Sequence, residues 1–181
     1  MKIQRGNWAL LSALLLTSAA APAPATPACH GSGWGTGRQI EVHAAPSPGS
    51  RVLARLAPRS AEQGGVDISG TLPEFEIRGV RAGWFLIGGA SYGDYGDPPP
   101  TRRLYAGEGW VRGEQISGQL YAGRLHVAPS QTSRSRAYGK GTDEVEVKRL
   151  LACAGSWMKI DSDIGTGWVP GLCGNQVTTC N

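Results

Sequence analysis

The chain lacks the residue patterns by which catalytic and metal sites are usually recognised. Only three of its 181 residues are histidines, four are cysteines, and aromatic residues make up 7%. No two cysteines stand in a CxxC spacing, so the sequence offers no zinc-binding pattern. No triad, carboxylate pair or cysteine–histidine couple stands in a recognisable catalytic context. The sequence therefore predicts a protein that is not an enzyme and that needs no cofactor or metal.

A strong charge of one sign is also missing. Loss of Lys2 and Arg5 with an N-terminal leader would lower Lys+Arg from 18 to 16 against 14 Asp+Glu, a net charge near +2. The basic residues at 102–103 and 134–136 are short local groups, interpreted as solvated loop charge. A nucleic-acid interface needs a clustered basic face, so no nucleic-acid partner is expected. Aspartates at 94, 97, 161 and 163 are too few at tight spacing for calcium and are interpreted as turn residues.

Long amphipathic helical stretches are absent as well, whereas glycine and proline are abundant. No window keeps apolar residues at helical spacing over three turns, and the chain has 27 glycines and 12 prolines. Short apolar or alternating stretches, bounded by glycine or proline turns, recur at 40–42, 52–56, 75–77, 84–87 and 110–111. This pattern is typical of β-sandwiches and barrels, so the sequence predicts an all-β fold.

The first residues have the layout of a secretion signal. Lys2 and Arg5 give a positive start, residues 8–16 are almost continuously apolar, and small residues follow at 18–21. This layout predicts a signal peptide over residues 1–20, cleaved after Ala20, with residues 23–25 as a second candidate site. The apolar run is far shorter than the roughly 20 residues of a membrane-spanning helix, so no stable membrane insertion is expected. The mature protein is predicted to be periplasmic or secreted, in a bacterium.

Residues 21–38 are predicted to be a Pro/Gly-rich linker. Residues 21–28 alternate alanine, proline and threonine, which favours an extended chain outside any sheet. The stretch His30 to Gly37 is rich in glycine but follows a proline-rich segment and precedes a predicted strand. A phosphate-binding loop needs a preceding strand and a following helix, so this stretch is interpreted as a flexible lead-in.

Three sequence landmarks occur twice in the same order. Ala-Pro-Ser stands at 45–47 and at 128–130, a tryptophan strand at 83–87 and at 156–160, and Gly-Trp-Val at 109–111 and at 167–169. Matched landmarks predict a duplicated unit, with domain 1 over residues 39–120 and domain 2 over residues 121–181. The spacings place two insertions in the first copy, within 60–74 and within 91–107. Insertions in repeats map to loops, and we expect the second to be mobile and dispensable for folding.

Each copy resembles a bacterial SH3 module, in which a Pro/Ser turn, a tryptophan strand and a Gly-Trp-Val strand follow one another. The resemblance covers residues 39–181 and implies two tandem small SH3-like β-barrels after a cleaved signal peptide. The first copy departs from the pattern by its two insertions. The second copy departs by lacking a clear Val/Leu strand after Ser133.

The resemblance also implies a groove lined by aromatic side chains that binds an extended peptide. The candidate ligand-binding residues are Tyr92, Tyr95, Tyr105, Trp84, Trp157 and Tyr138. A half-buried place at a barrel rim is the alternative for the tyrosines, and a place in the core is the alternative for the tryptophans. The implied ligand is a peptidoglycan peptide or glycan, or an extended segment of a periplasmic protein. The alternative function is an accessory or structural subunit that docks on a periplasmic partner.

Four cysteines in an exported chain predict disulfides, with three possible pairings. In SH3-like barrels the loop before the first tryptophan strand lies near the turn after the second, which implies a Cys153–Cys173 bridge. Cys29 would then pair with Cys180, one from each end of the mature chain. The rival arrangement joins Cys29 to Cys153 and Cys173 to Cys180.

Overall fold

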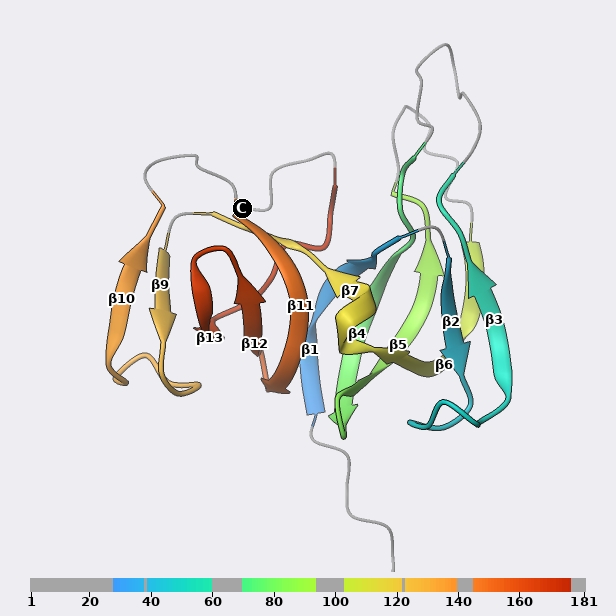
Figure 1. Ribbon diagram of the computed structural model, residues 1–181, viewed down its shortest axis with the longest axis horizontal. Helices are drawn as coiled ribbons and strands as arrows, with labels where there is room; N and C mark the ends of the chain where they lie inside the picture. Colours follow the sequence, from blue (N-terminus) through green and yellow to red (C-terminus); the bar gives the residue numbers. More distant parts are fainter. Residues whose placement is uncertain are drawn as a thin grey trace, which may run out of the picture.

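The protein is described here by a computed structural model over residues 28–37, 39–59, 70–93, 103–121, 123–139 and 145–176. These residues form two antiparallel β-sheets and a single 3-10 turn, η1 (Gly113–Gln115), with no α-helix in the described ranges. Both sheets are curled and lie side by side (Figure 1). The predicted all-β fold with two small barrel-like halves is therefore confirmed. The predicted signal peptide lies outside the described residues.

The first sheet has seven strands in the order β3-β2-β6-β5-β4-β1-β7. Their bounds are β1 (Ala28–Gly35), β2 (Ile40–His43), β3 (Val52–Leu56), β4 (Glu74–Arg81), β5 (Trp84–Ser91), β6 (Arg103–Arg112) and β7 (Ile116–Ser117). Side chains alternate across a strand, so β4 places Phe75 and Ile77 in the core and Glu76 and Arg78 on the outer face. This alternation positions the charged groups of the candidate site described below.

The second sheet has six strands in the order β10-β9-β13-β12-β11-β8. Their bounds are β8 (Gln119–Leu120), β9 (Gly123–His126), β10 (Ser135–Tyr138), β11 (Val145–Ala154), β12 (Trp157–Ser162) and β13 (Gly165–Val169). Strands β9 to β13 repeat the order of β2 to β6, and His126 opposes Trp168 as His43 opposes Trp110. The strand that the sequence did not reveal after Ser133 is β10.

The predicted linker over residues 21–38 is wrong for its second half. Ala28–Gly35 forms β1, which pairs with β4 and β7 inside the first sheet and buries Trp34. The glycines that suggested flexibility serve close packing instead. A Cβ at Gly33 would lie 2.8 Å from the Ser117 carbonyl oxygen, and a Cβ at Gly35 would lie 2.5 Å from Ile40 Cδ1. Side chains at these positions would push β1 away from its neighbours.

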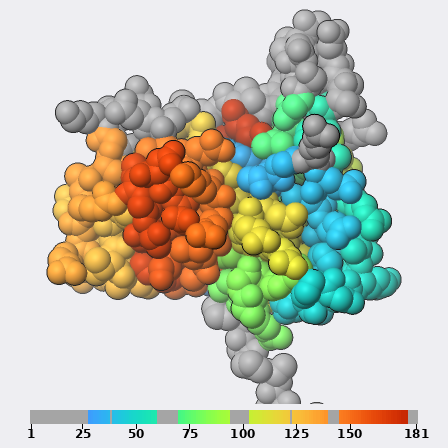
Figure 2. Space-filling view, in the orientation of Figure 1, coloured from blue at the N-terminus to red at the C-terminus, as the bar shows by residue number. Residues whose placement is uncertain are grey.

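The two halves share one core. Buried Phe85 and Val111 of the first sheet belong to the same hydrophobic cluster as Val147, Leu150 and Met158 of the second. Hydrogen bonds cross the same boundary. They are His30 N–H to the Gly155 carbonyl at 2.8 Å, Gly155 N–H to the Ala28 carbonyl at 3.1 Å, and Ser117 Oγ to the Val147 carbonyl at 2.5 Å. Figure 2 shows no gap between the halves, with the yellow segment that contains η1 and β7 at the boundary.

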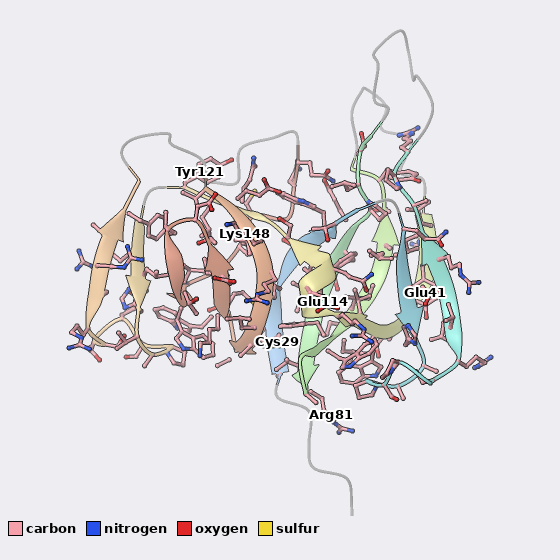
Figure 3. The ribbon with its side chains drawn as sticks, in the orientation of Figure 1. Cys29, Glu41, Arg81, Glu114, Tyr121 and Lys148 are labelled. Atoms are coloured by element: carbon pink, nitrogen blue, oxygen red, sulfur yellow. A yellow bond between two sulfur atoms is a disulfide. The ribbon has the colours of Figure 1, made fainter. Side chains whose placement is uncertain are left out.

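The predicted Cys153–Cys173 and Cys29–Cys180 pairs are wrong, and the Cys29–Cys153 pair of the rival arrangement is found. Cys29 of β1 is bonded to Cys153 of β11, with a Cα–Cα distance of 5.7 Å (Figure 3 labels Cys29). Because β1 lies beside the β11–β12 hairpin, where Cys29 and Gly155 form a parallel bridge, Cys29 faces the second half. Cys173 is also disulfide-bonded, to a partner outside the described residues. Its backbone pairs with Gln119 instead of approaching Cys153.

The second insertion is only partly a loop. Ser91 at the end of β5 pairs with Arg103 at the start of β6, so residues 103–107 continue the β5–β6 pairing, with register shifts on both sides of Ala90. Residues 94–102 lie outside the described part, as do residues 60–69 of the first insertion. The expectation of a dispensable loop over 91–107 is therefore wrong for its described ends. None of the described segments forms a helix long and apolar enough to span a membrane.

Candidate functional site

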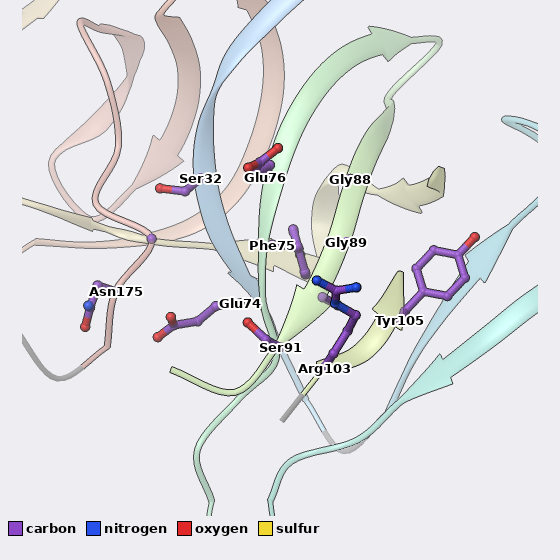
Figure 4. A pocket seen from close by; sticks show the side chains of 12 residues that line it. Ser32, Glu74, Phe75, Glu76, Gly88, Gly89, Ser91, Arg103, Tyr105 and Asn175 are labelled. Atoms are coloured by element: carbon purple, nitrogen blue, oxygen red, sulfur yellow. The ribbon is translucent and has the colours of Figure 1, made fainter. Parts of the chain in front are cut away.

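A pocket of about 410 Å³ lies on the first sheet where β1, β4, β5 and β6 meet the C-terminal segment (Figure 4). Charged side chains of both signs line it, with Glu74 and Glu76 from β4 and Arg103 from β6. Tyr105 of β6 is its half-exposed aromatic side chain, and the Tyr105 hydroxyl donates to the Glu108 carbonyl at 2.8 Å. The pocket therefore offers a cation, carboxylates and an aromatic ring within one concave surface.

Two adjacent glycines form part of the pocket lining. Gly88 and Gly89 of β5 line it, and Gly89 has a φ of 58°, a conformation that L side chains rarely adopt. Arg78 lies across Gly88, and its guanidinium bonds Glu76 and Glu108, each at 2.6 Å. Hydrogen bonds with Glu76 and then Glu108 raise the pKa of Arg78 above its usual value. The β5 backbone is therefore partly exposed at Gly89, whereas the charge network of Arg78 covers Gly88.

The second half of the molecule contributes one wall. Gly174 and Asn175 line the pocket, and a Cβ at Gly174 would lie 2.5 Å from the backbone nitrogen of Gly33. Gln176 fixes this segment against β4. Its backbone N–H donates to Glu74 Oε1 at 3.0 Å, and its side chain bonds both the N–H and the carbonyl of Leu72. The pocket thus forms only when the C-terminal segment is seated on the first sheet.

A second hollow of about 630 Å³ adjoins the first along β1 and β4. Both are lined by Ser32 and Glu76, and the second continues past Arg78 to His30 and Cys29. Together they make a groove that follows β4 from Tyr105 to the interdomain disulfide, which we call the β4 groove. An elongated surface of this kind suits an extended ligand better than a compact one.

A second matched feature is a histidine–tryptophan corner in each copy. The rings of His43 and Trp84 meet edge to face with centroids 5.0 Å apart, and those of His126 and Trp157 do the same at 5.0 Å. The histidine Nδ1 of each corner lies near the hydroxyl of a serine seven residues later, Ser50 at 3.4 Å and Ser133 at 3.3 Å. Each serine hydroxyl also donates to an alanine carbonyl in the turn, that of Ala45 or Ala128.

Sequence reasoning missed these corners, although a signal was present. Both copies have the pattern His-x-Ala-Pro-Ser-x-x-Ser, at 43–50 and 126–133, of which only Ala-Pro-Ser was used. The bonds within each corner hold the β2–β3 or β9–β10 turn in place. Both turns lie at the lower edge of the molecule in Figure 1. Their histidines are buried, so the corners stabilise the turns and offer little imidazole surface to a ligand.

The structure does not gather the predicted aromatic residues into one groove. Tyr92 is buried and donates from its hydroxyl to the Ala57 carbonyl at 2.8 Å, and Tyr138 is buried, which raises the pKa of its hydroxyl. Trp84 is 7% exposed and Trp157 is half-buried, each held by its histidine. Tyr95 lies outside the described residues. Of the predicted set, Tyr105 alone lines the β4 groove.

Metal-ligating side chains do not cluster in the described ranges. No group of three or more His, Cys, Asp or Glu residues there is placed to hold a metal ion. Aspartates 161 and 163, interpreted from the sequence as turn residues, bond Arg149 at 2.9 Å and Lys148 at 2.5 Å. The residues that line the pocket offer charge pairing, hydrogen bonding and ring stacking.

Comparison with known proteins gives little further guidance. The chain matches no family model and no curated protein sequence. Among solved structures it is similar to one titled "Structure of NlpC2 from Trichomonas vaginalis", with a TM-score of 0.30 and 12% sequence identity. The match covers 84% of this chain and 51% of that one, so the chain spans about half the length of the matched protein. A likeness at this level carries no argument about family or function.

Proposed function

We propose that the protein is an exported, non-catalytic binding module of two SH3-like units that holds an extended polar ligand in the β4 groove. The ligand class that fits best is a cell-wall peptide, alone or attached to its glycan. The observation that carries the proposal is that the two hollows share Ser32 and Glu76 as lining residues along β1 and β4.

The charges along the β4 groove support a peptide with both a carboxylate and an amine. Arg103 can bind a carboxylate through paired N–H groups, whereas Glu74 and Glu76 can accept hydrogen bonds from an ammonium group. The half-exposed ring of Tyr105 offers a flat apolar contact between them. The absence of a side chain at Gly89 leaves the β5 backbone partly exposed there, which suits recognition of a ligand backbone.

Sedimentation with purified insoluble peptidoglycan tests the proposal. The mature chain should pellet with the polymer, and the Arg103→Glu/Tyr105→Ala variant should bind about tenfold more weakly, because arginine and tyrosine anchors carry much of the energy of such interfaces. Arg51→Glu is the matched control, since this exposed arginine lies outside the groove and should leave binding unchanged. Equal thermal midpoints would establish that all three proteins are folded.

Two results would count against the proposal. Unchanged binding by the Arg103→Glu/Tyr105→Ala variant would place the ligand elsewhere. No sedimentation of the wild-type chain would remove the cell-wall ligand and favour the accessory-subunit alternative, in which a face of the molecule docks on a periplasmic partner.

A further inference from the structure

We propose a second binding site, separate from the β4 groove, on the β9–β10 hairpin, where an extended acidic peptide adds as a strand beside β10. The proposal rests on three independent properties of this hairpin: its charge, its place at the edge of the sheet, and its exposed apolar side chain. In Figure 1 the hairpin lies at the outer end of the second half, away from β1 and β4. The proposed second site therefore does not depend on ligand binding in the β4 groove.

The hairpin carries positive charge without compensation. No acidic residue occurs from 115 to 142, whereas Arg124, Arg134 and Arg136 lie in or beside β9 and β10. In the described part of the chain none of these three makes an ion pair. Arg124 bonds the side chain and carbonyl of Ser135, and Arg136 bonds the Ile164 carbonyl. Three guanidinium groups on one hairpin attract an acidic ligand.

In the equivalent β2–β3 hairpin of the first half, an acidic residue pairs with an arginine. Glu41, two residues before His43, forms an ion pair with Arg55 across β2 and β3 at 3.0 Å. The corresponding position two residues before His126 is Arg124, so the duplicated unit has a reversed charge there. Two described acidic residues of the second half have partners elsewhere, Asp161 with Arg149 and Asp163 with Lys148. The basic hairpin is thus a property of the second copy alone.

The backbone of β10 has a free side in the described structure. β10 is the terminal strand of its sheet and pairs only with β9. The Val127 N–H bonds the Arg134 carbonyl at 3.0 Å, so Arg134, Arg136 and Tyr138 direct their backbone groups toward β9. Alternation in an antiparallel ladder then directs those of Ser135 and Ala137 outward. An incoming strand can bond these groups, as extended peptides do at exposed sheet edges.

An apolar contact lies next to the arginines. Val127 is 60% exposed, the large hydrophobic side chain that the described chain leaves most open to solvent. It lines a pocket of about 220 Å³ with Leu125, Arg134, Arg136 and Thr166. Arg134 and Arg136 stand two residues apart and therefore on the same face of the strand. Val127 opposes Arg134 and lies on this same face, so a matching ligand strand carries carboxylates at alternate positions toward it.

Fluorescence anisotropy with two labelled synthetic peptides tests this site. The probe is a capped Glu-Val-Glu-Val-Glu peptide, and the comparison peptide has the same sequence with N-methylated backbone amides. The full mature chain should bind the probe, more weakly as salt rises, and bind the methylated peptide about tenfold more weakly because strand pairing is blocked. Vesicles of anionic lipid and a soluble anionic polysaccharide serve as competitors without a peptide backbone.

Two protein variants separate charge from strand pairing. Arg134→Glu/Arg136→Glu should lower affinity for the probe about tenfold through charge repulsion, whereas Arg51→Glu, at the position that matches Arg134 in the first copy, should not. Ala137→Pro keeps every charge but removes an N–H that points away from β9. An edge strand tolerates proline at such a position, so the variant should fold and should bind the probe more weakly. Arg103→Glu/Tyr105→Ala should bind the probe as the wild type does, which separates this site from the groove.

The proposal fails if the wild type does not bind the probe. It fails also if the wild type binds the methylated peptide as tightly as the probe and Ala137→Pro binds the probe as tightly as the wild type does. Binding would then come from charge attraction alone. Preference for the vesicles or the polysaccharide over the probe would assign the hairpin to those polyanions and overturn the peptide proposal.

Discussion

Gly33 shows how a single missing side chain allows β1 to lie inside the first sheet. A Cβ there would meet the Ser117 carbonyl at 2.8 Å and Ile116 Cγ2 at 3.1 Å, and the carbonyl belongs to the backbone of β7 and cannot rotate away. Gly49 in the β2–β3 turn is its opposite, because a Cβ there would have no heavy atom within 4 Å. The two glycines make a matched pair for a packing test.

We expect Gly33→Ala to lower the free energy of unfolding by about 1–3 kcal/mol, the usual effect of overpacking. Gly49→Ala should change it by less than about 0.5 kcal/mol, as exposed substitutions do. Urea denaturation of both variants and the wild type measures the difference. Equal stability of the two variants would mean that β1 does not pack against β7 as described.

At the residue scale the sequence predicted neither burial nor ligand contact fully. Of the tryptophans at matched positions, Trp84 and Trp110 are buried, whereas Trp157 and Trp168 are half-buried, and the hydrophobic core cluster is built from smaller side chains. Tyr92 and Tyr138 were predicted as ligand contacts, but their rings are buried, and nothing in the sequence distinguishes a rim tyrosine from a buried one. The β4 groove could not be predicted, since Glu74, Arg103 and Asn175 meet only through sheet pairing and the seating of the C-terminal segment.

Strands with apolar alternation were predictable, whereas the strands that join the halves were not. β2 to β6 and most of β9 to β13 follow apolar stretches bounded by turns. β1 is rich in glycine, and β7 and β8 have two residues each, so none of them carries a period-two signal. Their positions depend on the opposite half of the molecule, and tertiary contacts override the weak local propensity.

The Cys29–Cys153 disulfide links β1, the strand that the sequence did not predict, to β11. It closes a loop with a sequence separation of 124 residues, for which the chain-entropy model gives about 5 kcal/mol of stabilisation. We expect the Cys29→Ser/Cys153→Ser variant to lose about 2–5 kcal/mol in urea denaturation, the range for native disulfides in small exported domains. An unchanged midpoint would indicate either that the disulfide is absent or that it does not restrict the unfolded chain. Peptide mapping without reductant decides between these outcomes.

For the whole molecule, the shared core argues against two independently folding domains. Phe85 and Leu150 belong to one hydrophobic cluster although they come from different sheets, and a Cβ at Gly113 would meet both Phe85 and the Leu150 backbone. The resemblance to tandem SH3-like barrels predicts separable units, each folded around its own core. Here buried residues of both sheets belong to one cluster, so the halves stabilise one another.

We therefore expect a single cooperative unfolding transition for the mature chain. Tryptophan fluorescence and far-ultraviolet circular dichroism should give the same urea midpoint, because all probes coincide in a two-state transition. A fragment of residues 121–181 should remain unfolded, since it loses the contacts of β1 with β11 and β12. Two resolved transitions, or a folded fragment, would contradict a shared core.

The bridge between β1 and β11 also bears on the order of events during synthesis. Cys29 and Cys153 are consecutive cysteines along the chain, so oxidation in the order of their appearance gives the native pair without later exchange. At about 5–20 residues per second, Cys29 waits roughly 6–25 s for its partner to be made. During that interval β1 has no second half to contact, and the first sheet must stay open on that side. β1 is thus the first strand to be synthesised but one of the last to be held in place, because its disulfide forms only when nearly the whole chain has been made.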